Sequence, residues 1–208
     1  MTKRTLFPIA LLFAVLAVLL VAAVIVLGPG AGRPPAGEEP PLAGATIGGP
    51  FSLIDQNGKP FTSQNLSGRY ALIYFGYTFC PDVCPTDVQR MMQGLKQFEK
   101  KDPARGAKVQ PVFITVDPER DTPEAVKQFV SAFHPRLIGL TGSPAAVEQA
   151  MKAYRIYAKK AGPEGSKDYL VDHSANGYLF DTEGRPMLLF ASTDTPEAIA
   201  AQLNQWVK

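Results

Sequence analysis

The stretch Tyr70–Gln89, "YALIYFGYTFCPDVCPTDVQ", holds the only two cysteines among 208 residues, with three residues between them. Its first eight residues are apolar and rich in β-forming side chains, which predicts a buried strand. After the cysteines, apolar residues recur at helical spacing, which predicts a helix. Thr86 and Gln89 match a capping box and Pro85 suits a first helical turn, so we expect the helix to begin there. The cysteines then lie between a buried strand and a helix N-terminus.

The same alternation continues on both sides of this stretch. Apolar runs and turn residues predict buried strands at 109–117 and 137–142, and β-hairpins at 51–62 and 177–192. Amphipathic patterns that open with Thr-Pro or Ser-Pro predict helices at 122–133, 143–160 and 195–208. Alternating strands and helices indicate an α/β sheet, and this order matches a thioredoxin-like fold with an N-terminal β-hairpin extension. In such sheets ligands bind at the carboxyl ends of the strands, where the cysteines lie.

The N-terminus predicts a single transmembrane helix ahead of this domain. Residues 6–27 are uncharged and apolar, and as a helix they would be about 33 Å long, enough to cross a bilayer. Lys3 and Arg4 precede the span, so residues 1–5 should stay in the cytoplasm and the rest should be exported. The prediction is a bacterial inner-membrane anchor with its domain in the periplasm. A cleaved signal peptide is the alternative, although its apolar region would be shorter.

Composition separates a tether from the folded domain and excludes one class of partner. Residues 28–45 are rich in Pro, Gly and Ala and cannot build a core, so we read them as a tether, with residues 46–208 as the domain. The net charge is only +2 and no block of basic residues occurs, which argues against nucleic-acid binding.

Three kinds of chemistry are open to the cysteine pair. A helix N-terminus stabilises a thiolate, so we expect both thiols to be activated. The pair could form a structural disulfide, but so short a loop would stabilise the fold little. It could exchange thiols and disulfides, although the usual motif has two intervening residues. It could bind a soft metal ion such as Cu(I) or Zn(II), which needs at least one more ligand.

Only two histidines could complete such a metal site. His134 follows an amphipathic helix and precedes a proline, where a structural role at the helix C-terminus is expected. His173 lies just before the last hairpin, in a segment that we predict to be a loop facing the cysteines. Cys80, Cys84 and His173 would together suit copper, and Asp172 could orient the imidazole.

Three segments of this sequence resemble the signature segments of the Sco/SenC family, copper chaperones for cytochrome c oxidase assembly. They are "YFGYTFCPDVCP", "VDPERDTP" and "DYLVDHSANGYLFD", and the resemblance runs from about Ile47 to the C-terminus. It implies a thioredoxin-like fold and copper bound by Cys80, Cys84 and His173. The family's aspartates fall on Asp82 and Asp172. Some members have a histidine before the first cysteine, where this chain has Phe79.

The resemblance also implies partners and two alternative activities. As a copper chaperone, the protein would supply the dinuclear copper centre of cytochrome c oxidase subunit II and would not be an enzyme. As a thiol–disulfide reductase, it would keep the cysteines of that subunit reduced. Other periplasmic copper chaperones or thioredoxin-like reductases are further candidate partners. A peroxidase of the peroxiredoxin type is disfavoured, because Tyr77 occupies the position of the required threonine. We favour the chaperone, because thiol exchange needs no imidazole ligand.

Overall fold

A computed structural model describes residue 13 and residues 38–163 and 168–208. The chain divides into two units, and all the strands described belong to the second, Pro34–Lys208. The predicted cytoplasmic tail, most of the predicted span and part of the tether lie outside the described residues. Within the residues described, no helix is long and apolar enough to cross a membrane.

A seven-stranded mixed sheet in the order β2-β1-β5-β4-β3-β8-β9 forms the centre of this unit. Its strands are β1 (Ser52–Asp55), β2 (Pro60–Thr62), β3 (Tyr70–Gly76), β4 (Val109–Thr115), β5 (Ile138–Thr141), β8 (Gly177–Phe180) and β9 (Pro186–Phe190). The three central strands β3, β4 and β5 are parallel, and the outer pairs are antiparallel. Both β3 and β4 are buried along all seven residues, as expected for strands covered on both faces.

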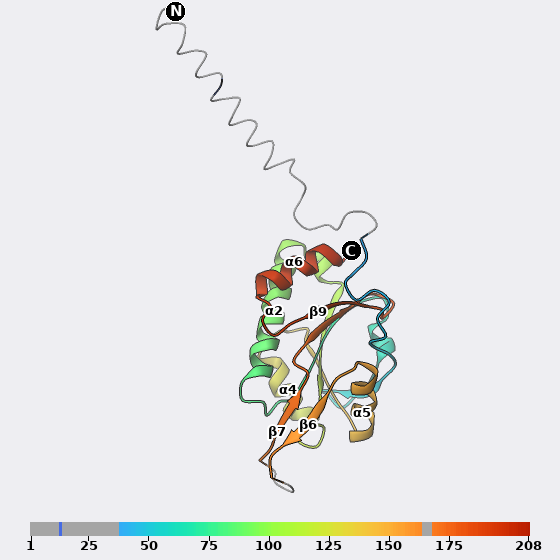
Figure 1. Cartoon of the computed structure of the whole chain (residues 1–208), viewed down its shortest axis with the longest axis vertical. Helices are drawn as coiled ribbons and strands as arrows, with labels where there is room; N and C mark the ends of the chain where they lie inside the picture. Colours follow the sequence, from blue (N-terminus) through green and yellow to red (C-terminus); the bar gives the residue numbers. More distant parts are fainter. Residues whose placement is uncertain (1–12, 14–37, 164–167) are drawn as a thin grey trace, which may run out of the picture. The chain divides into compact units, whose positions relative to one another are not determined.

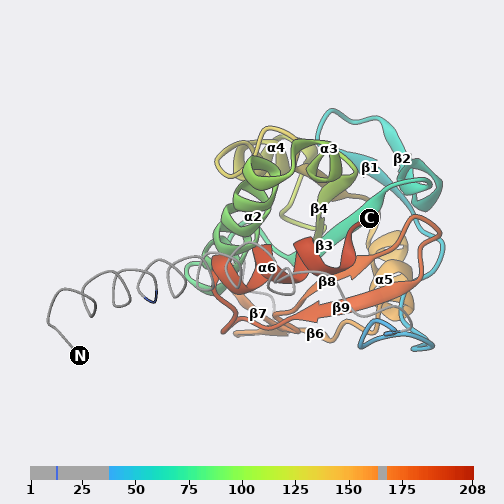
Figure 2. The ribbon, with the colours of Figure 1, turned by 90° about the horizontal axis from the view of Figure 1, so that it is seen from above.

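Helices cover both faces of the sheet. They are the 3-10 turn η1 (Ser63–Leu66) and the helices α2 (Val83–Lys101), α3 (Pro103–Gly106), α4 (Pro123–Ser131), α5 (Pro144–Ala153) and α6 (Pro196–Trp206). The helices α2 and α6 pack against each other, and α5 lies across the sheet from them (Figures 1 and 2). The thioredoxin-like α/β fold expected from the sequence is confirmed, and the N-terminal hairpin joins the sheet because β1 also pairs with β5.

The predicted helix at 143–160 was wrong in its second half. The helix α5 ends at Ala153, and Arg155 takes a left-handed backbone conformation with φ of 58°. This turn allows both Tyr154 and Ile156 to be buried, although residues two apart point away from each other in a helix. The chain then enters a strand instead of continuing as a helix.

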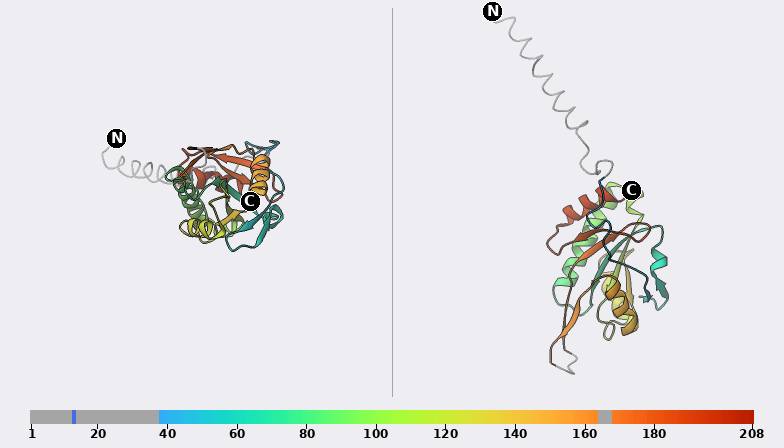
Figure 3. Two further views of the ribbon diagram at one scale, coloured as in Figure 1. Left: turned by 90° about the horizontal axis from the view of Figure 1, so that it is seen from below. Right: turned by 45° about the vertical axis from the view of Figure 1, so that its right-hand side comes forward.

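That strand belongs to a second, two-stranded sheet that the sequence did not predict. The strand β6 (Ala158–Ala161) pairs antiparallel with β7 (Leu170–His173), and Ala158 lies opposite His173. This β6–β7 hairpin lies at the end of the unit opposite α6 (Figures 1 and 3). His173 is therefore the last residue of a strand, and the prediction that it lies in a loop was wrong.

The predicted start of the helix after the cysteines was also wrong. The helix α2 begins at Val83, with Asp82 as its N-cap residue, so Cys84 is in the first turn. Thr86 does not cap the helix; its hydroxyl donates to the Asp82 carbonyl at 2.8 Å. Pro85 fits in this first turn because backbone N–H groups there have no partner inside the helix.

Candidate metal centre

The two cysteines are close together but differ in exposure. Both are free thiols; Cys84 is fully buried and Cys80 is partly exposed. The backbone N–H of Cys84 donates to the Cys80 sulfur at 3.4 Å, because the first turn of α2 points its free N–H groups toward the loop before it. The loop thus places one thiol at the surface and the other beneath it.

His173 approaches the buried thiol from the β6–β7 hairpin. Its Nε2 atom lies 3.2 Å from Cys84 Sγ, and its Nδ1 atom lies 3.0 Å from the Ser174 carbonyl oxygen. Because a carbonyl can only accept, Nδ1 carries the proton and Nε2 accepts from the thiol. Asp172, which was expected to orient this ring, is exposed, and the Ser174 carbonyl takes that role instead.

Two tyrosines of the cysteine-bearing strand and loop enclose the imidazole. The rings of Tyr74 and Tyr77 meet the His173 ring edge to face, with centroids 6.3 and 5.8 Å away. The Tyr77 hydroxyl also accepts from the backbone N–H of Val171 at 3.2 Å, which ties β7 to this loop. The ring is therefore fixed on several sides.

The surroundings shift the pKa values of the two thiols in opposite directions. Burial raises the pKa of Cys80, but the backbone N–H groups of Cys84 and Asp82 outweigh it, and the pKa falls below its ordinary value. Burial raises the pKa of the Cys84 thiol far more than the backbone at Tyr77 lowers it. The expectation that both thiols are activated was therefore wrong for Cys84, because its complete burial disfavours the thiolate more than the helix N-terminus favours it.

Burial also keeps the imidazole neutral. It lowers the pKa of His173 below its ordinary value, against the opposing effects of the Ser174 carbonyl and of Asp87 and Asp172. A neutral imidazole with Nδ1 protonated presents Nε2 as a donor of electrons to a metal ion.

The structure brings the three predicted side chains together without arranging them as a closed coordination shell. Cys84 and His173 are in contact, and Cys80 is bonded to the backbone of Cys84. In the part of the chain that the structure describes, no three His, Cys, Asp or Glu side chains already form a group that could hold a metal ion. Filling the site would therefore require the thiols to turn toward a common point.

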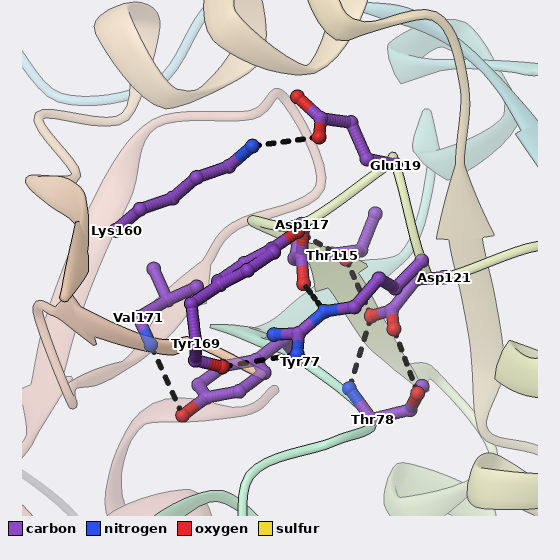
Figure 4. A network of polar contacts seen from close by, with 10 residues as sticks. Tyr77, Thr78, Thr115, Asp117, Glu119, Asp121, Lys160, Tyr169 and Val171 are labelled. Atoms are coloured by element: carbon purple, nitrogen blue, oxygen red, sulfur yellow. Dashed lines mark hydrogen bonds and ion pairs between the residues drawn. The ribbon is translucent and has the colours of Figure 1, made fainter. Parts of the chain in front are cut away.

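A buried carboxylate from the quoted segment "VDPERDTP" fixes the cysteine loop. Asp121 is fully buried, and it accepts from the backbone N–H and the hydroxyl of Thr78 at 3.0 and 2.7 Å (Figure 4). It also accepts from the Thr115 hydroxyl at 2.6 Å. The segment was quoted from the sequence, but Asp121 was given no role, because its burial depends on packing against Thr78 and Thr115.

A second missed carboxylate lies beneath the site. Asp87 is buried on α2, accepts from the Tyr74 hydroxyl at 3.0 Å and forms an ion pair with Arg90. Its position three residues after Cys84, within the apolar face of the helix, was the available signal.

The remaining sequence predictions concern residues outside the cluster. His134 is buried beside Glu99, 3.2 Å away, which confirms its structural role, although burial lowers its pKa and disfavours the cation expected at a helix end. Asp82 starts α2 without a capping bond from its side chain. Phe79 is 55% exposed next to Cys80.

Comparisons with known proteins match one family over most of this chain. The SCO1/SenC family model matches residues 39–208. The mitochondrial protein SCO2 of Saccharomyces cerevisiae is 45% identical over 140 residues, which are 67% of this chain and 46% of that protein. The chain thus matches about half the length of this curated relative.

Two solved structures are similar in fold and sequence. The structure of Bradyrhizobium japonicum ScoI with copper bound is 48% identical, with a TM-score of 0.67, and the match covers 76% of this chain and 97% of that one. The structure of BsSco, a member of the Sco family of cytochrome c oxidase assembly proteins with an identified disulfide switch, is 26% identical, with a TM-score of 0.58. That match covers 79% of this chain and 90% of that one.

Proposed function

This chain belongs to the SCO1/SenC family, and from that premise we propose that it is a copper chaperone that binds copper through Cys80, Cys84 and His173. The observation that carries the proposal is the 3.2 Å contact between Cys84 Sγ and His173 Nε2, which joins donors from two separate elements. Two thiolates and one imidazole favour a soft ion such as Cu(I). The copper bound to the related ScoI supports the same choice of metal.

Each residue would have a distinct part in loading and release. Cys80 is partly exposed and has the lower thiol pKa, so it would meet the incoming ion first. Cys84 and His173 would follow, and copper would take the place of the proton that the thiol shares with Nε2. Exchange with an external disulfide, which is itself reduced to two thiols, would oxidise Cys80 and Cys84 to a disulfide and release the copper, because a disulfide offers no thiolate.

The proposed destination is the dinuclear copper centre of cytochrome c oxidase subunit II. The similarity to BsSco, which belongs to a family of cytochrome c oxidase assembly proteins, supports this assignment. The copper is cargo in this scheme. The predicted anchor at residues 6–27 would hold the domain at a bacterial inner membrane, in reach of a membrane-bound partner on its periplasmic side.

A second candidate function is reduction of the cysteines of the same subunit. A partly exposed thiol of lowered pKa beside a buried thiol is the arrangement that thiol–disulfide exchange uses. The disulfide switch identified in BsSco also favours it. Metal binding and exchange would be alternative redox states of one site.

A titration of the reduced protein in detergent with Cu(I), against a competing chelator, tests the proposal. We expect one copper ion per chain, loss of tight binding in Cys80→Ser and Cys84→Ser, and weaker binding in His173→Ala. Lys159→Gln on the same hairpin is the matched control, because that side chain is exposed and should leave the affinity unchanged.

Thiol-exchange rates of the same proteins separate the two functions. His173→Ala should exchange thiols at nearly the rate of the unmodified protein, because the attacking thiolate is that of Cys80, which is stabilised by backbone N–H groups and not by the imidazole. Unchanged copper affinity together with lost exchange in His173→Ala would exclude the ligand role and favour the reductase.

A further inference from the structure

The β6–β7 hairpin carries His173 but is not part of the main sheet. Its two strands form hydrogen-bonded pairs only with each other in the described sheets. Apart from the short connection from His173 to β8, the position of the imidazole relative to Cys84 depends on contacts between side chains and the hairpin. One such contact is the bond from the Val171 N–H to the Tyr77 hydroxyl.

The loop after β4 supplies a second and more extensive attachment, centred on Tyr169. The Tyr169 hydroxyl donates to Asp117 Oδ1 at 2.7 Å (Figure 4). The backbone carbonyl oxygen of Tyr169 accepts from Arg120 Nη1 at 2.9 Å. The Arg120 guanidinium carbon also lies 3.7 Å from the centroid of the Tyr169 ring. Tyr169 is thus held by its hydroxyl, its backbone and its ring face, four residues before His173.

The same guanidinium reaches the loop that carries the first cysteine. Its carbon lies 5.0 Å from the centroid of the Phe79 ring and 5.8 Å from that of Tyr77. Arg120 Nε donates to Asp117 Oδ2 at 2.6 Å, and Asp117 is 1% exposed. A buried carboxylate with charge-assisted bonds of this length holds the guanidinium plane in one orientation.

We propose that Arg120 and Asp117 are positioning residues for His173: by holding Tyr169 against the cysteine loop, they keep the imidazole within reach of Cys84. The inference rests on the proposed function, because its purpose is to complete the copper site. Partners that orient metal ligands typically contribute about 10-fold to 100-fold to metal affinity. Arg120 and Asp117 would do so through Tyr169, without touching the metal.

The test compares Arg120→Gln and Tyr169→Phe with a matched control, Lys159→Gln. Lys159 belongs to the same hairpin and carries the same charge as Arg120, but its side chain is exposed, and substitutions at such surface positions change little. Two quantities are measured on the full chain in detergent: Cu(I) affinity by chelator competition, and the rate at which diethyl pyrocarbonate modifies His173 in the metal-free protein. Buried His134 is the internal reference for that rate.

Arg120→Gln should lower copper affinity about 10-fold to 100-fold and should raise the modification rate of His173 relative to His134. Tyr169→Phe removes a single hydroxyl, so it should shift both quantities less in the same direction, and it carries the test if Arg120→Gln does not fold. Lys159→Gln should match the unmodified protein. Adding Arg120→Gln to His173→Ala should cause no further loss of copper affinity, because Arg120 acts on that affinity through His173.

An unchanged modification rate of His173 in both Arg120→Gln and Tyr169→Phe overturns the proposal, whatever happens to copper affinity. A further loss of affinity in the double variant, or an affinity that stays normal while His173 becomes reactive, overturns it as well. If the unmodified protein binds no copper, the proposed function fails. In that case the modification rates of His173 alone decide whether Arg120 and Asp117 hold the hairpin in place.

Discussion

At the scale of single residues, the two thiols of one short loop have opposite properties. The partly exposed Cys80 is stabilised as a thiolate by backbone N–H groups, and the buried Cys84 is held as a thiol that donates to His173. The sequence indicated a helix N-terminus beside both, which is why both were expected to be activated. Burial, which decides the difference, depends on how β3, α2 and the hairpin pack and cannot be read from the local sequence.

The first prediction concerns the order and pH dependence of alkylation. Iodoacetamide reacts with thiolates, so in the reduced, folded protein it should modify Cys80 before Cys84. A lowered pKa keeps Cys80 ionised at lower pH than an ordinary thiol, so its rate should reach half its maximum at a lower pH. Peptide mass spectrometry across a pH series gives both rates.

In Cys84→Ser the pH at which alkylation of Cys80 reaches half its maximal rate should remain low, because the backbone N–H at position 84 is retained. Modification of Cys84 first, or at the same rate as Cys80, would contradict this difference between the two thiols.

At the scale of elements, the strands and helices with strong local patterns were predictable, and the hairpin that carries His173 was not. The strand β6 has the sequence Ala-Lys-Lys-Ala, which has little β propensity, and it continues directly from a helical pattern. Its pairing with β7 is a long-range contact. The sequence therefore identified His173 as a candidate ligand but assigned it to a loop.

The packing of α2 on α6 leads to a second prediction, for Gly94→Ala. Replacing glycine inside a helix by alanine ordinarily stabilises it by about 1 kcal/mol. At Gly94 the added Cβ would lie 2.7 Å from Ile199 Cγ2 and 2.9 Å from the Pro196 carbonyl oxygen. Overpacking of this kind typically costs about 1–3 kcal/mol, so we expect net destabilisation in urea.

Gln93→Ala on the exposed face of the same helix is the control and should change the unfolding free energy by less than about 0.5 kcal/mol. A gain in stability for Gly94→Ala would show that the two helices are not packed this closely.

At the scale of the whole molecule, the predicted arrangement of anchor, tether and domain leads to a third prediction. The full chain should stay in the membrane fraction after an alkaline carbonate wash, because residues 6–27 should span the bilayer. A chain that begins at Glu39, where the family match begins, should be water-soluble and retain its thermal unfolding midpoint and copper stoichiometry. Recovery of most of the full-length protein in the soluble fraction, cut near residue 30, would indicate a cleaved signal peptide instead.

X-ray absorption at the copper edge of the reduced, Cu(I)-loaded chain tests the central claim most directly, because it counts the atoms bound to the metal. Ligation by Cys80, Cys84 and His173 predicts two sulfur neighbours and one nitrogen neighbour in the unmodified protein. In His173→Ala the histidine signal should disappear while both sulfurs remain. A shell without two sulfurs, or a histidine signal that survives in His173→Ala, would contradict the proposed copper site.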